Sequence, residues 1–173
     1  LTAVDISPDL LERAKARPEC RSVTFVRTNL EEPLELADDS FDALCGVSVL
    51  HHLDTPTALP ALLRKLRPGG LFAFSEPNLL NPINKYLAFS PDPARRKRWG
   101  TSPGEMAFRP HELRSEMERA GFQVLSLDHR DFLHPSTPPA FIPIVCGIQA
   151  VAEGVPLLRM MSGSLWISGR RPA

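Results

Sequence analysis

The sequence lacks an excess of charge of either sign and has few cysteines. Lysine and arginine together number 20, as do aspartate and glutamate, so the net charge is zero and no basic surface is expected to attract nucleic acid. Cys20, Cys45 and Cys146 are widely spaced and form no Cys-x-x-Cys pair, which argues against a disulfide framework and against a metal site. This cysteine usage favours a reducing compartment, and we predict a cytoplasmic protein without a bound metal.

No apolar run is both long enough and unbroken enough to cross a membrane. Residues 135–162 are strongly apolar, but Pro143, Glu153, Pro156 and Arg159 interrupt any span of about 20 residues. We therefore expect a packed or interfacial helical segment there, which leaves association with a membrane surface open.

The first half of the chain alternates the signals of strands and helices. Short apolar or β-branched runs at 1–6, 22–26, 41–49 and 71–75 predict strands. Helices are indicated after Ser7-Pro8 and at Pro56, the second ending at Gly69-Gly70. Because the run at 41–49 is almost continuously apolar, we expect a strand buried on both faces, in a parallel sheet with helices on each side.

The second half departs from this alternation. Residues 79–109 are rich in proline, asparagine and arginine, and we expect an irregular insertion or lid. A helix is predicted over 110–120, and strands over 122–128 and 163–171, the last returning antiparallel. With 173 residues, of which 43% are hydrophobic, the chain suits a single α/β domain over 1–173.

Asp5 stands at the end of the first predicted strand. In doubly wound sheets an acidic residue at this place can bind both hydroxyls of a ribose, because its two oxygens match a vicinal diol. An aspartate at a helix entry can also simply help to cap the turn. The residue alone leaves both interpretations open.

Four stretches in sequence order resemble the class I S-adenosylmethionine-dependent methyltransferases, especially the type 11-like small-molecule group related to quinone methyltransferases. They are VDISPDLLERAKAR, FVRTNLEEPLELADDSFDALCG, VSVLHHL and LRKLRPGGLFAFSEPN. The resemblance covers residues 1–77, and more loosely 110–128 and 164–170. It implies a Rossmann-like methyltransferase sheet, mostly parallel with an antiparallel C-terminal strand. It also implies S-adenosyl-L-methionine as cofactor and in-line methyl transfer to a small acceptor.

The resemblance also implies which residues bind the adenosine part of the cofactor. Asp5 matches the residue that holds the ribose hydroxyls, and Ile6 matches the apolar residue that packs on the adenine. Asn29 stands where the family usually has an aspartate facing the adenine amino group, and its side-chain oxygen can still accept that hydrogen bond. Leu30 matches the residue whose backbone amide meets an adenine ring nitrogen.

Other matching positions lie nearer the methyl group. Gly46 and Val47 correspond to backbone positions beside the methionine moiety. Glu76 and Asn78 follow the strand at 71–75 and are candidates for contact with the substrate, since ligands bind at the carboxyl edge of such sheets.

His51 and His52 follow the strand at 41–49, near the expected methyl donor. Adjacent residues on a helix point about 100° apart, so we expect at most one of the two imidazoles to face the site. That imidazole could serve as a general base for a protonated acceptor. The histidines could equally be structural residues that orient the turn.

The family pattern places a first strand and a Gly-rich turn about 20 residues ahead of the acidic residue. No Gly-rich loop precedes Gly46 in this sequence. We therefore expect an incomplete copy of a longer protein, with two unpaired inner strand edges. The fragment alone is expected to be inactive, to bind the cofactor poorly and to aggregate.

Two other functions remain open at this point. Asp5 would serve the ribose of NAD equally well, which allows a nicotinamide-dependent oxidoreductase, although Tyr86 is the only tyrosine and no lysine follows it within four residues. A non-catalytic, methyltransferase-like interaction domain is the other alternative. For the methyltransferase, the apolar, proline-rich segments 79–109 and 135–162 suggest a hydrophobic or lipid-linked acceptor.

Overall fold

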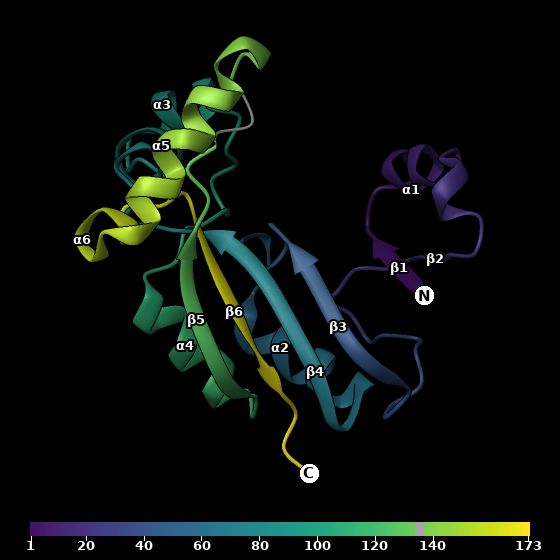
Figure 1. Cartoon of the computed structure of the whole chain (residues 1–173). Helices are drawn as coiled ribbons and strands as arrows, with labels where there is room; N and C mark the ends of the chain where they lie inside the picture. Colours follow the sequence, from purple (N-terminus) through teal and green to yellow (C-terminus); the bar gives the residue numbers. More distant parts are fainter. Residues whose placement is uncertain (134–136) are drawn as a thin grey trace.

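The computed structural model describes residues 1–133 and 137–173 (Figure 1). Residues 135 and 136 of the predicted helical segment lie outside the described residues. The strands of the described part are β1 (Thr2–Asp5), β2 (Thr24–Arg27), β3 (Phe41–Val47), β4 (Leu66–Pro77), β5 (Gln123–Arg130) and β6 (Ser164–Arg170). The α-helices are α1 (Pro8–Lys15), α2 (Thr55–Lys65), α3 (Pro93–Arg98), α4 (Pro110–Arg119), α5 (Ile142–Gly154) and α6 (Pro156–Arg159).

The strands form two sheets. Strands β1 and β2 pair in parallel as a two-stranded sheet, in which Asp5 lies opposite Arg27. The other four strands form a second sheet in the order β3-β4-β6-β5. Strand β3 is parallel to β4, while β6 is antiparallel to both of its neighbours. The predicted α/β fold with a mostly parallel sheet and an antiparallel C-terminal strand is therefore confirmed.

Helices α2 and α4 cover one face of the four-stranded sheet. Both carry the helical spacing that their sequences predict, and their apolar side chains meet those of β4 and β6. The buried cluster includes Leu59, Leu62, Leu113, Met117, Phe72, Phe74, Leu165 and Ile167. The hydrophobic core of the chain therefore lies between this face of the sheet and the two helices.

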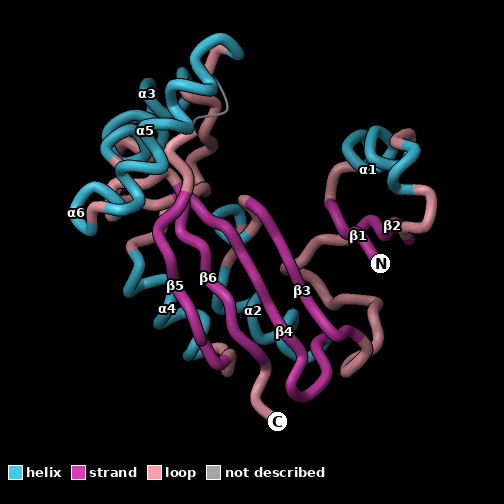
Figure 2. The backbone as a smooth tube through the Cα atoms, viewed as in Figure 1, coloured by secondary structure: helices cyan, strands magenta, loops and turns pink. Residues whose placement is uncertain are grey.

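The described helices do not cover the opposite face of this sheet, so the prediction of helices on both faces is wrong. We predicted a strand buried on both faces over 41–49, with helices on each side, but alternate residues Ala43, Cys45 and Val47 of β3 are exposed. Trp166 of β6 is also 54% exposed. Figure 1 shows α2 and α4 behind the sheet and none of the described helices in front of it, and α1 lies beyond β1 instead (Figure 2). Successive side chains of a strand point to opposite faces, so every second residue of β3 faces this uncovered side.

Helix α2 ends earlier than the sequence predicted. The sequence predicted that this helix stops at Gly69-Gly70, but it ends at Lys65 and β4 begins directly at Leu66. Leu66 has an extended backbone and lies opposite Phe41 in the sheet, so strand pairing ends the helix four residues early. Gly69 still adopts a left-handed conformation, with φ of 76°.

The insertion 79–109 and the helical segment after residue 136 form one layer at the carboxyl end of β4 (Figure 1). The side chains of Asn78, which precedes the insertion, and of Asn84 within it form hydrogen bonds with the backbone at the end of the helical segment. The Asn78 amide donates to the carbonyls of Met160 (2.9 Å) and Ser162 (2.8 Å), and the Asn84 amide donates to that of Gly163 (2.9 Å). None of the helices within residues 1–133 and 137–173 is long and apolar enough to traverse a bilayer. A lid function for 79–109 stays a prediction.

Candidate active site

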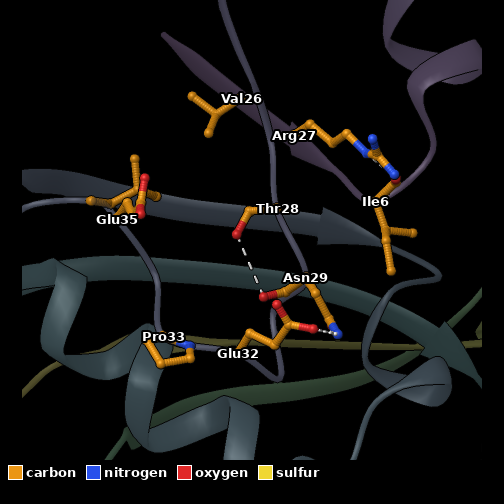
Figure 3. A pocket seen from close by; sticks show the side chains of 9 residues that line it. Ile6, Val26, Arg27, Thr28, Asn29, Glu32, Pro33 and Glu35 are labelled. Atoms are coloured by element: carbon orange, nitrogen blue, oxygen red, sulfur yellow. Dashed lines mark hydrogen bonds between the residues drawn. The ribbon is translucent and has the colours of Figure 1, made fainter.

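A pocket of about 430 Å³ lies where β1 and β2 end (Figure 3). Its walls come from Ile6, from residues 26–29, which include the end of β2, and from the loop that follows. Ile6 presents an apolar side chain that is 61% exposed. The pocket therefore combines an apolar wall with polar groups at the end of a parallel strand pair, which is where nucleotide-like ligands bind in such sheets.

Asp5 sits at the entrance to α1. Its Oδ1 accepts a hydrogen bond from the backbone amide of Ser7 at 2.7 Å. Ser7 in turn caps the helix, since its hydroxyl accepts from the Leu10 amide at 3.4 Å. The Ser7 bond uses only one of the two carboxylate oxygens. The turn-capping and ligand-binding interpretations of Asp5 are thus compatible.

Asn29 lines the same pocket (Figure 3). Its side-chain oxygen accepts from the Glu31 amide at 3.1 Å, and its amide group donates to the Glu32 carboxylate at 3.1 Å. These local bonds fix the side chain in one orientation. Leu30, the next residue, instead borders the space between the two sheets.

That space, of about 550 Å³, separates the two halves of the predicted cofactor site. Residues 1–4 of the β1 segment border it on one side and residues 41–46 of β3 on the other. Gly46 borders the space, whereas Val47 at the end of β3 is 75% exposed. Asp5 and Gly46 therefore belong to separate sheets, and no described strand pairs with both β1 and β3.

Glu76 organises the turn that carries the two histidines. Its side chain is 1% exposed, and its Oε1 accepts from the amides of Val49 (3.1 Å) and Leu50 (2.8 Å). Its Oε2 contacts the amide of His51 at 3.2 Å and the Nδ1 of the same residue at 3.0 Å. The carboxylate thus caps the 3₁₀ helix Leu50–His52 and fixes the His51 ring.

The rings of His51 and His52 lie together, with centroids 3.9 Å apart and a 37° tilt. Ideal α-helix geometry led us to expect the two rings to point apart, but in the 3₁₀ helix Leu50–His52 they lie next to each other. His51 is buried, whereas the side chain of His52 is half exposed. A role for either residue as a general base stays a prediction.

Glu105, which the sequence did not single out, completes this cluster. Its Oε1 lies 3.7 Å from His52 Nδ1 and accepts from the Ser102 amide at 3.0 Å. Burial raises the pKa of Glu105, but the hydrogen bonds from Ser102 and the nearby imidazoles outweigh it, so this pKa lies below its usual value. Glu105 lies far from the histidines in sequence, so no local motif could have revealed it.

Asn78 is fully buried, and both ends of its side chain are used within the chain. Its amide binds the carbonyls of Met160 and Ser162, as described above, and its oxygen accepts from the Leu80 amide at 3.0 Å. Asn78 and Glu76 therefore position backbone segments at the carboxyl edge of β4. Their contact with a substrate stays a prediction.

Comparison with known proteins gives partial sequence matches and a shared fold. Residues 1–74 match the family described as methyltransferase domain. Methyltransferase AacuQ of Aspergillus aculeatus is 33% identical over 69 residues, which are 40% of this chain and 22% of that protein. A probable phthiotriol/phenolphthiotriol dimycocerosates methyltransferase 2 of Mycobacterium ulcerans is 33% identical over 76 residues, which are 43% of this chain and 29% of that protein. The solved structure of an S-adenosylmethionine-dependent methyltransferase from Mesorhizobium loti superposes with a TM-score of 0.66 at 23% identity, over 98% of this chain and 79% of that one.

The sheets, with a polar pocket at the strand ends, define a Rossmann-like cofactor-binding fold. Residues 1–74 match the methyltransferase domain family, and the chain shares the fold of solved S-adenosylmethionine-dependent methyltransferases. The Mesorhizobium loti protein is described as dependent on S-adenosylmethionine. The chain spans between a fifth and a third of the length of the two curated relatives.

Proposed function

We propose that the protein transfers a methyl group from S-adenosylmethionine to a small acceptor by in-line displacement. The observation that carries this proposal is the pocket lined by Ile6 and Asn29, within the segment that matches the methyltransferase domain; Asp5 precedes Ile6 in the chain but does not line the pocket. The residues present fit an adenosine, because Ile6 offers an exposed apolar surface and Asp5 keeps one carboxylate oxygen outside the Ser7 bond. No observation favours the oxidoreductase or the interaction domain.

In this proposal the cofactor supplies an activated methyl group when bound, so the chain mainly has to hold the two reactants in line. Asp5 would bind the ribose hydroxyls, Ile6 would pack on the adenine, and Asn29 and the Leu30 amide would contact the adenine edge. For an acceptor that arrives protonated, one of the two histidines would remove the proton.

The methionine end would lie at Gly46 and Val47. A side chain at residue 46 would place its Cβ 2.9 Å from the Phe74 ring, so the glycine keeps the backbone there close to the core. Because Gly46 and Asp5 lie in separate sheets, a cofactor that contacts both would bridge the space between the sheets.

We propose further that the acceptor is hydrophobic or lipid-linked and that the protein acts in the cytoplasm. Ile144, Ile148 and Val151 are exposed along one side of α5. A pocket of about 700 Å³ lies in the insertion and includes Pro91 and Pro103 in its walls. The name of the Mycobacterium ulcerans relative, which shares part of this sequence, refers to phthiotriol and phenolphthiotriol dimycocerosates.

Calorimetric titration of the purified protein with S-adenosylhomocysteine and with NAD tests the cofactor. Because the chain alone is expected to bind the cofactor poorly, we expect weak binding of S-adenosylhomocysteine. We expect Asp5→Asn to weaken it about tenfold further or more, since a hydrogen bond to a charged group contributes about 1.5–3 kcal/mol. Asp9→Asn, in the exposed first turn of α1, is the matched control. Equal effects of the two substitutions, or preferential binding of NAD, would overturn the proposal.

The acceptor is tested with radiolabelled S-adenosylmethionine. A panel that pairs lipid-linked phenols and polyols with their short polar counterparts separates the acceptor classes. Methylation confined to the polar members would contradict a hydrophobic acceptor while leaving methyl transfer itself intact.

A further inference from the structure

The cluster formed by His51, His52 and Glu105 has the donor set of a metal site. One ring nitrogen of each histidine and one carboxylate oxygen of Glu105 lie within 4.8 Å of one another. Two imidazoles and a carboxylate are a common donor set for zinc and related ions. The sequence predicted no metal site because these residues form no spacing motif, but the fold brings them together.

Glu76 orients the His51 ring so that one of its nitrogens is available to bind a metal ion. The buried carboxylate contacts His51 Nδ1 at 3.0 Å and the backbone amide of the same residue at 3.2 Å. A histidine that binds a metal through one ring nitrogen usually donates the proton on the other to a carboxylate or a carbonyl. The Glu76 contact therefore fixes the tautomer that presents Nε2 as the binding atom.

The backbone holds Glu105 beside the two rings. The amide of Met106 donates to the His51 carbonyl at 3.0 Å, which fixes the 102–106 turn against the histidine turn. The Ser102 amide binds the Glu105 carboxylate at 3.0 Å and orients it. The Phe89 ring lies nearly perpendicular to the His51 ring, with centroids 6.1 Å apart, and gives the cluster one apolar wall.

We propose that His51, His52 and Glu105 bind a divalent transition-metal ion such as Zn²⁺. Donor atoms around a tetrahedral zinc lie about 3.4 Å apart, given bonds of about 2.1 Å. The His52 and Glu105 donor atoms are already 3.7 Å apart, and the half-exposed side chain of His52 can rotate to close the set. Three protein donors leave a coordination position open, as in catalytic zinc sites. Mg²⁺ is disfavoured, because it prefers oxygen donors.

The site lies just beyond the carboxyl end of β3, which ends at Val47 beside the proposed methyl donor. With the ion bound, the imidazoles are ligands and are not general bases. An acceptor hydroxyl that coordinates the open position would instead lose its proton to solvent, because coordination lowers the pKa of the oxygen. Metal binding itself does not depend on the proposed methyl transfer.

Titration of the chelator-treated protein with Co²⁺ tests the site, since the visible absorption of Co²⁺ reports its coordination geometry. We expect one equivalent to bind with visible bands of a four- or five-coordinate ion, and Zn²⁺ to displace it. His52→Asn should weaken binding at least about 100-fold, and Glu76→Gln about 10–100-fold, the usual cost of losing an orienting partner. His111→Asn, which changes an exposed histidine on α4, is the matched control and should bind like the parent protein.

Two results would overturn the proposal. One is the absence of saturable Co²⁺ binding to protein that circular dichroism shows to be folded. The other is binding that survives His52→Asn but is lost when the exposed Cys45 and Cys146 are replaced by serine, which would assign the ion to thiolates. If the protein binds Co²⁺ but transfers no methyl group, the metal site is supported and the proposed methyl transfer fails. If the protein transfers a methyl group but binds no Co²⁺, the metal site is refuted and the methyl transfer is supported.

Discussion

Replacement of Glu76 should reveal how much of the stability of the chain rests on one buried carboxylate. In Glu76→Ala, three backbone amides, those of Val49, Leu50 and His51, lose their acceptor in a buried setting, as does His51 Nδ1. A buried donor left without a partner costs about 1–3 kcal/mol. Because some of these groups can recruit water in the space left by the side chain, we expect a net loss of about 3–5 kcal/mol in the free energy of unfolding.

Glu76→Gln should cost much less, for a reason specific to this site. The glutamine oxygen can take the place of Oε1 and keep the Val49 and Leu50 bonds, so that its amide group faces His51. The imidazole can then change tautomer and accept from that amide through Nδ1. Only the His51 backbone amide is left without a partner, and we expect a loss of about 1–3 kcal/mol.

Urea unfolding followed by circular dichroism measures both changes, with Glu118→Ala on the exposed face of α4 as the control. The ordering is the strict requirement, with alanine the most destabilising, glutamine intermediate and the control near zero. A loss below about 1 kcal/mol for Glu76→Ala would refute the capping role that the structure gives to this residue.

Two further predictions concern β5 and β6. Burial lowers the pKa of His129, and the positive charge of Arg159 lowers it further, while the charge of Asp128 acts in the opposite direction. Because the unfolded chain, in which the histidine pKa is about 6.5, then binds the proton more readily, the free energy of unfolding should fall as the pH drops below that value. His129→Gln should flatten that part of the pH profile, measured as urea midpoints at pH 7.5 and 5.5, and an unchanged slope would contradict the assignment. Gly169→Ala should destabilise the chain by about 1–3 kcal/mol or more. A Cβ at this position would clash with the Gln123 carbonyl oxygen and would lie 2.8 Å from the Phe72 ring. Gly147→Ala on α5, where a Cβ meets nothing within 4 Å, should be neutral or stabilising by up to about 1 kcal/mol, and thermal melts that rank the two the other way would refute this packing.

The helices and strands were predictable wherever local chemistry decides them. Ser7-Pro8 marks the start of α1, and Leu59 and Leu62 fix the buried side of α2, because capping and helical spacing act within a few residues. The end of α2 was not predictable in this way. The pairing of Leu66 with Phe41 decides it, and that contact joins positions far apart in sequence.

In the candidate site too, residues with a local sequence signal were predictable, whereas those placed by contacts distant in sequence were not. Asp5 was selected from its place at a strand end and Ile6 from the family resemblance; the structure puts Ile6 on a pocket, and cofactor binding by either residue stays a prediction. Glu76 was selected as a possible substrate contact, which stays a prediction; what the sequence did not reveal is that its carboxylate caps the histidine turn. Glu105 carried no local signal, because contacts distant in sequence, such as the Met106–His51 hydrogen bond, bring its turn to the histidines.

The division of the strands into two sheets also has a thermodynamic consequence. Strands β1 and β2 share no ladder hydrogen bonds with β3–β6, so the pair can open as a separate cooperative unit while the larger sheet stays folded. A ligand held by both Asp5 and Gly46 would act as a reversible crosslink between the units. At 100 times its dissociation constant, such a ligand would add about 2.7 kcal/mol to the free energy of that opening. Occupancy of the site and the integrity of the N-terminal sheet would then rise and fall together.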